Sequence, residues 1–444
     1  MINKEQLEQL RPFEARAIIE GLRKGSVPVE YVSFFTVGRA NWLTFIEDDL
    51  DQYIAAGGAK VRFINGDYGD GKTHFMSIIR HLALEKGFAV SFVVLTREVP
   101  MQKFELVYRE IVRQLRLPAG LLGDRIMTGE GGGIRALVSG WADKSAAEIA
   151  STTDAAVEEM LASRRQEMGA LPGMDVSFAN ALAGLLENRI RPLREGESEE
   201  DRLGEREILF QWFEGGKVGK KELKPWQIFE PLSKTNSKRL LSSLLAYLRY
   251  LGAKGLILLL DELETVIAQS TSVRNAAYEN VRLLIDNIEE ARFLHIFFSI
   301  IPDVILAEKG FKSYDALWSR VRSIGEASRL NFRSILIDLH RTPLETPELV
   351  ELGLALRRIH EISYRWEAKD LVNEGLIEQI CANQKRMGLL SEVRLFIKQI
   401  IRILDMAEQG MLPDEELDLS EQILVSRQEM EEEKVTQLQP NWDR

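Results

Sequence analysis

The stretch "FINGDYGDGKTHFMSIIRHL", residues 63–82, places three glycines just before a lysine and a threonine. Glycine is costly inside regular structure, so such a cluster indicates a backbone with unusual dihedral angles. Four of its residues match the spacing G-x-x-x-x-G-K-[ST], namely Gly66, Gly71, Lys72 and Thr73. The flanking segments "KVRFING" (60–66) and "THFMSIIRHLALEKG" (73–87) predict a strand that enters the loop and a helix that leaves it.

A loop of this pattern is suited to binding phosphate groups. Its glycines allow successive backbone N–H groups to point inward, and the N-terminal end of the following helix adds positive potential. Lys72 would reach the β- and γ-phosphates of a nucleotide, and the Thr73 hydroxyl would coordinate Mg²⁺. The alternative is an ordinary glycine turn between a strand and a helix. The predicted nucleotide contacts of this loop are Gly66, Asp67, Tyr68, Gly69, Asp70, Gly71, Lys72, Thr73 and His74.

A second motif supplies carboxylates. The segment "GLILLLDELETV" (255–266) begins with the apolar run that a strand buried on both faces of a parallel sheet requires. The run ends in Asp261 and Glu262, at the carboxyl edge where open α/β sheets bind ligands. Asp261 would hold Mg²⁺ through water, and Glu262 would polarise the attacking water in phosphoryl transfer. The alternative is that the two acids only begin the next helix, because acidic residues favour a first helical turn.

Three further apolar stretches extend the predicted sheet. They are "FAVSFVVL" (88–95), "FLHIFFSII" (293–301) and "SILIDLH" (334–340). Together with the strands of the two motifs, they give at least five strands separated by helical stretches. This alternation predicts an α/β fold with a doubly wound parallel sheet and right-handed crossovers.

Composition limits the class of protein. A chain of 444 residues exceeds one ordinary core and predicts two or three lobes, and its 45% hydrophobic and 28% charged residues are typical of a globular protein. We expect a cytoplasmic location, because no apolar run has transmembrane length, the N-terminal segment lacks the apolar core of a signal peptide, and the single cysteine suits a reducing compartment. No His/Cys cluster has the spacing of a zinc site. The net charge of −11 argues against a broadly basic DNA-coating surface but is compatible with a local basic channel.

The order of the motifs resembles that of AAA+ P-loop ATPases, closest to their initiator and STAND-like branch. The resemblance rests on the glycine loop, "LLLDE" (258–262), a polar residue ending the next strand, "LWSRV" (317–321), "FFTVGRANWLTFIEDDL" (34–50) and "MGLLSEVRLFIKQII" (387–401). The chain resembles more closely the BrxD-type ATP-binding proteins of the BREX anti-phage systems. That likeness rests on "AIIEGLRKGSVP" (17–28), "FFTVGR" (34–39), "INGDYGDGKTHF" (64–75), "LLLDELE" (258–264) and the closing arginine helix.

The resemblance implies further roles for single residues. Ser299 falls at the sensor position that holds the γ-phosphate or water, although many relatives carry Asn or Thr there. Arg394 falls at the position of an arginine in the lid that reaches back to the nucleotide; the alternative is a solvated helix-face arginine. Arg320 falls near an arginine finger supplied to a neighbouring subunit, with Arg322 close enough to compete and a solvated helix end as the alternative. The segment of Val37, Gly38 and Arg39 would approach the base or ribose.

The same reasoning divides the chain into five segments. We predict an N-terminal segment with the first part of the ATPase core (1–117), a mainly helical insertion (118–235), the second part of the core (236–342), a helical lid (343–412) and an acidic tail (413–444). A charge-rich break is expected within the insertion at 193–207. The segment "WFEGGKVGKKELKPW" (212–226) would contact nucleic acid or a protein partner, or would form a solvated loop anchored by its two tryptophans. The region after 343 is too short for a lid and a winged-helix domain together, which puts autonomous sequence-specific DNA binding in doubt.

Three function classes fit these motifs. The first is an ATP-hydrolysing AAA+-like motor or remodelling protein of a defence system, acting with ATP and Mg²⁺, with DNA as an open possibility. The second is a slow nucleotide-dependent switch that controls partner assembly, and the third is a scaffold with structural ATP. The set of Lys72, Thr73, Asp261 and Glu262 disfavours the scaffold. The resemblance implies a homo-oligomer and other defence-system proteins as partners, and no membrane.

Overall fold

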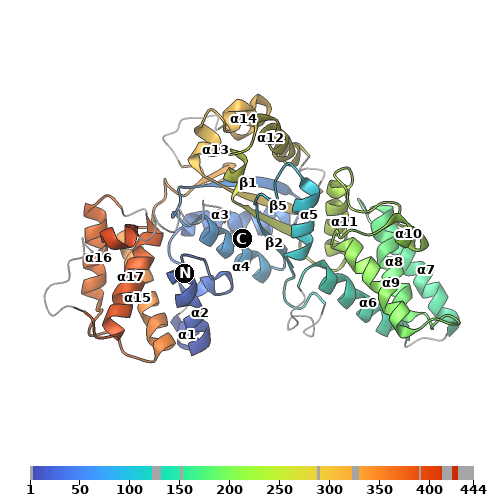
Figure 1. The fold of residues 1–444 in the computed structure, drawn as a ribbon, viewed down its shortest axis with the longest axis horizontal. Coiled ribbons are helices and arrows are strands. Elements are labelled where there is room, and N and C mark those ends of the chain that lie inside the picture. Colours follow the sequence, from blue (N-terminus) through green and yellow to red (C-terminus); the bar gives the residue numbers. More distant parts are fainter. Residues whose placement is uncertain are drawn as a thin grey trace, which may run out of the picture.

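The computed structural model describes residues 4–122, 132–150, 154–287, 291–322, 330–389, 392–412 and 423–428. A central sheet lies between two groups of helices along the long axis of the molecule (Figure 1). One group comes from the middle of the chain, within residues 134–250. The other combines helices from the N-terminal part with helices of residues 346–408.

Six strands form one sheet in the order β3-β2-β4-β5-β1-β6. The strands are β1 (Ala59–Asn65), β2 (Ala89–Val94), β3 (Leu115–Arg116), β4 (Leu256–Asp261), β5 (Leu294–Ile300) and β6 (Leu336–Asp338). All paired neighbours run parallel except β2 and β3, which are antiparallel. The five predicted strands are present. The sequence missed β3, because two residues are too few to show a periodic pattern.

Side chains of the strands alternate between two apolar layers, as the two-residue period of a strand requires. On one face, Ile257 and Leu259 of β4 pack with α3 (Ala40–Asp48) and α4 (Lys72–Glu85). On the other face, Leu256, Leu258 and Leu260 belong to the core that includes α5 (Phe104–Arg113), α11 (Ser237–Tyr250) and α12 (Thr271–Asp286). The sheet is therefore buried on both faces, which explains the continuous apolar run that the sequence showed at 255–260.

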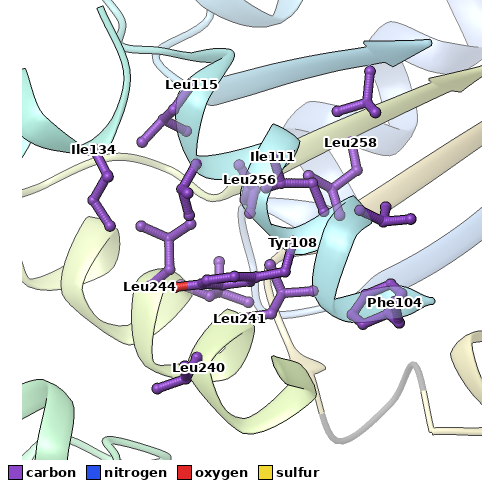
Figure 2. Close-up of a cluster of buried hydrophobic side chains, with 14 of the residues drawn as sticks. Phe104, Tyr108, Ile111, Leu115, Ile134, Leu240, Leu241, Leu244, Leu256 and Leu258 are labelled. Atoms are coloured by element: carbon purple, nitrogen blue, oxygen red, sulfur yellow. The ribbon is translucent and has the colours of Figure 1, made fainter. Parts of the chain in front are cut away.

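Among the helices within residues 134–250, α11 packs against the sheet through α5. Figure 2 shows Tyr108 and Ile111 of α5 between Leu256 and Leu258 of β4 and the leucines of α11, with Leu244 beside the Tyr108 ring. All of these side chains are buried. We call this cluster, which also holds Phe104, Leu240 and Leu241, the apolar seam.

The inserted helices form a bundle of their own around α8. Their bounds are α6 (Ile134–Ala150), α7 (Asp154–Ala170), α8 (Val176–Ile190), α9 (Glu199–Phe213), α10 (Lys220–Leu223) and the 3₁₀ turn η4 (Lys224–Trp226). The predicted break at 193–207 was wrong in its second half, because α9 begins at Glu199. The side chain of Ser198 accepts a hydrogen bond from the Asp201 N–H, and the Asp201 carboxylate accepts one from the Ser198 N–H, so the acids there cap a helix.

Both tryptophans of the segment 212–226 are buried. Trp212 donates its indole N–H to the Glu230 carbonyl at 3.0 Å, and Trp226 packs against Gly184 of α8. The lysines between them are exposed: Lys217, Lys220, Lys221 and Lys224. The buried tryptophans favour the alternative of a solvated segment that they anchor, because neither indole is free to stack on a base. The segment is not a loop throughout, since α10 and η4 lie within it.

Helices from the two ends of the chain share one core. α2 (Pro12–Arg23) packs on α15 (Thr346–Tyr364) and α17 (Val393–Glu408), and Ile18 and Ile19 are fully buried there. The remaining elements of this group are α1 (Lys4–Glu8), the 3₁₀ helix η1 (Val29–Phe34) and α16 (Glu374–Arg386). Most of the predicted tail (413–444) lies outside the described residues. Within it, Ile423 is buried against Leu389 and Leu395.

Candidate functional site

The glycine loop lies between β1 and α4, at the carboxyl edge of the sheet. Gly69 and Gly71 have φ of +99° and +86°, angles that a residue with a Cβ adopts only with strain. The loop is closed by the Asp67 N–H, which donates to the Asp70 carboxylate at 2.7 Å. Lys72 is the first residue of α4, so the free N–H groups of the helix start point toward the loop.

The Lys72 ammonium is folded back over this loop. It donates to the carbonyls of Gly66 at 2.9 Å and Asp67 at 3.2 Å, and its side chain is 7% exposed. It also lies 5.2 Å from the centre of the Tyr68 ring, which is itself mostly exposed. A single positive charge is thus held where the loop surrounds it.

Residues from three distant segments meet beside Lys72. The Thr73 hydroxyl donates to one Asp261 carboxylate oxygen at 2.7 Å, and the Ser299 hydroxyl of β5 donates to the other. Ser299 also accepts the Glu262 N–H at 2.9 Å. The predicted residues Thr73, Asp261, Glu262 and Ser299 are therefore brought together, and Ser299 fixes the two acids.

Glu262 has the left-handed backbone angle φ +65°, which is uncommon for a residue with a side chain. The turn lets the chain leave β4 sharply while Asp261 and Glu262 both stay at the sheet edge. Burial, and next the Asp261 carboxylate, raise the pKa of Glu262 above its usual value. A carboxylate with a raised pKa is a better proton acceptor, which suits a general base.

Thr73 and Asp261 offer a hydroxyl and a carboxylate, the hard oxygen donors that Mg²⁺ prefers, and Asp261 is 2% exposed. A second set of possible ligands consists of Asp67, Asp70 and His340, whose donor atoms lie within 4.8 Å of one another. His340 follows β6, so its position next to the loop depends on strand order and gave no signal in the sequence.

The segment of Val37, Gly38 and Arg39 approaches the same loop. Gly38 has φ +69° and lies against Glu348 of α15 and Leu344 just before that helix, where a Cβ would collide with both. Arg39 donates to the Asp70 carbonyl at 2.6 Å, and burial lowers the pKa of its guanidinium to about 10.

His74, beside this segment, lies 3.2 Å through Nε2 from the Thr36 hydroxyl and packs on the Phe35 ring. Burial, followed by the charge of Arg39, lowers the pKa of His74 to about 4. His74 is therefore neutral at physiological pH and helps to hold residues 35–39 in place.

Arg394, at the start of α17, also reaches the loop. Its Cβ lies 3.8 Å from where a Cβ on Gly69 would sit, and a Cβ on Gly25 would collide with its guanidinium. Gly25 has φ +69°, so this position requires glycine for two reasons. The C-terminal helices thus place Arg394 over the loop, and its role at the nucleotide stays a prediction.

Arg320, expected to reach a neighbouring subunit, forms an ion pair within its own chain. On α14 (Asp315–Val321), its guanidinium binds the Asp286 carboxylate of α12, with one N–H···O distance of 2.9 Å, and it also donates to the Ala316 carbonyl. Leu317 and Val321 are buried as expected. Arg322 follows α14 and is exposed, and residues 323–329 lie outside the described residues.

One acidic residue of the site was missed. Glu264, in the 3₁₀ turn η5 (Leu263–Val266), lies 3.9 Å from the Lys72 ammonium and is 7% exposed. Its presence in "DELE" was visible in the sequence, but its direction depends on the sharp turn at Glu262.

The glycine loop, its lysine and the acids lie together at one edge of the sheet of an α/β protein. Residues 10–422 match the family model described as "BREX system ATP-binding protein BrxC/D". The match covers most of the chain, so the chain belongs to this family, and the resemblance inferred from its motifs is confirmed. The family name implies ATP binding and a place in a defence system. Comparison with curated proteins and with solved structures gives no significant match.

None of the helices in the described part of the chain is long and apolar enough to cross a membrane.

Proposed function

We propose that this protein binds ATP and Mg²⁺ at the glycine loop and hydrolyses ATP, as an AAA+-like motor or remodelling component of a BREX-type anti-phage system. The observation that carries the proposal is the hydrogen-bonded chain from Thr73 to Asp261 to Ser299 beside Lys72. These residues come from α4, β4 and β5, and only the parallel sheet brings them to one edge. The loop between β1 and α4 supports assignment to the P-loop NTPase fold.

The residues divide the work as follows. Lys72 and the N–H groups of residues 66–71 would bind the phosphates. Thr73 and Asp261 would hold Mg²⁺, which would offset charge on the phosphate oxygens. Glu262 would orient a water molecule and accept its proton, while Ser299 keeps Asp261 and the Glu262 backbone in place.

The C-terminal helices and the N-terminal segment would complete the pocket. Arg394 lies over Gly69, and Arg39 reaches the Asp70 carbonyl from the opposite end of the chain. Both cations would face the nucleotide, so a change of nucleotide would be felt by the core that α2 shares with α15 and α17. That coupling is what a remodelling protein needs.

Calorimetric titration of Lys72→Ala with ATP and Mg²⁺ tests the proposal. We expect most of the affinity to be lost, because the lysine supplies the only ammonium that the described loop places over its carbonyls. Lys86→Ala is the matched control. Lys86 caps the opposite end of α4 and pairs with Asp51, so this variant should bind ATP as the unmodified protein does. Equal binding by both variants would remove the site assignment.

A slow nucleotide-dependent switch is the second candidate. The observation in its favour is the ion pair between Arg320 and Asp286 of the same chain, which must open before Arg320 could serve a neighbouring subunit. Steady-state ATPase activity, measured with and without DNA and over a range of protein concentrations, separates the two candidates. A motor that shares sites should turn over faster per subunit as its oligomer forms, and mixing Arg320→Ala with Lys72→Ala subunits should restore some activity. Full activity in a monomer, at every concentration, would favour the switch.

A further inference from the structure

Glu264 is a buried acid that has no role in the function proposed above. Among the described residues, neither of its carboxylate oxygens has a hydrogen-bond partner, although the residue is only 7% exposed. Buried carboxylates in folded proteins are almost always hydrogen-bonded or paired, because the charge is otherwise expensive to remove from water. An acid kept in this condition beside a binding loop calls for a functional reason.

The Lys72 ammonium, 3.9 Å away, is the positive charge that faces Glu264. At this distance the ammonium and the carboxylate form no hydrogen bond. The ammonium instead donates to the Gly66 and Asp67 carbonyls. The negative groups around Glu264 are the carboxylates of Glu262 and, further off, Asp261. Three carboxylates therefore lie around one ammonium, and these four groups together carry a formal charge of −2. Arg39 and Arg394 lie at the loop as well, on the side of Asp70 and Gly69.

The elements packed against η5 are β5, α12 and α13 (Pro302–Leu306). α12 carries the cation Arg274, whose guanidinium donates to the Gln269 carbonyl and the Thr271 hydroxyl. Ser299 of β5 is neutral, and Asp303 of α13 carries another negative charge near Tyr68. Burial, then the carboxylates of Glu264, Glu262 and Asp303, raise the pKa of Tyr68 to about 12.

We propose that Glu264 is an internal competitor of the nucleotide: its carboxylate faces Lys72 and opposes the phosphates that would bind there. The inference rests on the proposed ATP site and concerns the regulation of that site. Asp261 is tied to Thr73 and Ser299, and Glu262 is the proposed general base, so Glu264 is the acid of the three to which we assign an effect on affinity alone.

A cation requirement follows from this arrangement. A polyphosphate adds several negative charges beside this negative cluster of Lys72 and the three acids, and a divalent cation supplies two positive ones. Glu264 would therefore make the protein discriminate against nucleotide that arrives without its metal. It is a positioning residue, since it would act through Lys72 and not on the reacting atoms.

The test is the dissociation constant of ADP for the full chain, measured by calorimetry at pH 8 with Mg²⁺ and with EDTA. Glu264→Gln keeps the shape of the side chain and removes its charge. We expect ADP to bind about tenfold more tightly to this variant in EDTA, a change of about 1.4 kcal/mol, and about threefold more tightly with Mg²⁺. Glu264→Asp retains the charge and should stay within about twofold of the unmodified protein.

Glu308→Gln is the charge-matched control. Glu308 is exposed and lies beyond α13, so removing its charge should leave both dissociation constants unchanged. If Glu264→Gln binds ADP no more tightly than the unmodified protein, or if Glu308→Gln gains as much, Glu264 is not a competitor. Failure of the unmodified protein and of every variant to bind ADP or ATP would instead remove the proposed function.

Discussion

Two buried regions of this molecule are built on opposite physical principles. In the apolar seam, Tyr108, Leu244 and Leu258 pack side by side and are at most 1% exposed (Figure 2). At the carboxyl edge of the sheet, a short distance along β4, the buried groups are Lys72, Asp261 and Glu264 instead. Burying apolar surface stabilises a fold by about 25 cal/mol for each Å². Burying charges destabilises it unless every charge is paired.

The difference indicates what each region contributes. The seam joins α5 and α11 to the sheet, so its value lies in stability. The carboxyl edge buries three carboxylates around one ammonium, and Glu264 among them has no hydrogen bond, so we expect this edge to lower stability and to serve binding and chemistry. Substitutions in the two regions should therefore separate function from stability.

The largest expected effect is on turnover at the carboxyl edge. Glu262→Gln keeps the shape of the side chain but removes the charge that would accept a proton from water. Steady-state ATPase activity should fall by about a hundredfold to ten-thousandfold, while calorimetry should find ATP bound nearly as tightly as before. The free energy of unfolding should not decrease, because a buried negative charge is removed.

Normal turnover by Glu262→Gln would move the general base to another carboxylate. The first one to substitute would then be Glu264, whose side chain lies next to it.

The sequence predicted the residues at the carboxyl edge of the sheet better than it predicted how distant segments pack around them. The loop of Gly66 to Thr73 and the pair Asp261–Glu262 were visible, because phosphate and metal binding demand these residue types at close spacing. The five parallel strands were visible as well, because each is an apolar run of at least several residues.

Other features could not be predicted, because they depend on contacts between segments far apart in the chain. The core shared by α2 and α15 joins residues more than 300 positions apart, and both helices are amphipathic on their own. The same holds for the ion pair between Arg320 and Asp286 and for the position of Glu264 beside Lys72, which the sequence does not predict. The predicted domain boundaries and the roles of single residues stay predictions.

The next effect in size concerns stability, at the seam. Leu244→Ala removes a fully buried side chain next to the Tyr108 ring and leaves a cavity. Chemical denaturation should show a loss of about 3 kcal/mol in the free energy of unfolding, and the dissociation constant of ATP for the folded protein should not change.

Leu203→Ala is the control for this change. Leu203 lies on α9 with 54% of its surface exposed, so its removal should shift the free energy of unfolding by about 0.5 kcal/mol or less. If Leu244→Ala also weakened ATP binding severalfold, the seam and the site would be coupled and the contrast between them would be wrong.

The smallest expected effect tests whether the edge lowers stability. Burial, and next the Glu262 carboxylate, raise the pKa of Glu264 to about 7. In the unfolded chain a glutamate has a pKa of about 4.3, so the folded protein holds this proton more tightly than the unfolded chain does. Protonated Glu264 therefore makes its full contribution to the free energy of unfolding below about pH 4. This contribution is lost as the pH rises through about 7 and the folded protein gives up the proton.

Glu264→Gln cannot ionise, so this loss should be absent from the variant. In the nucleotide-free protein, its free energy of unfolding should exceed that of the unmodified protein by about 1–2 kcal/mol at pH 8, and the difference should shrink at pH 5.5. Chemical denaturation at the two pH values measures both differences, with Glu308→Gln as the control that should show neither. A difference of the same size at both pH values would mean that Glu264 does not titrate in this range. The effect would then come from packing, and the contrast between the seam and the edge would no longer be one of charge.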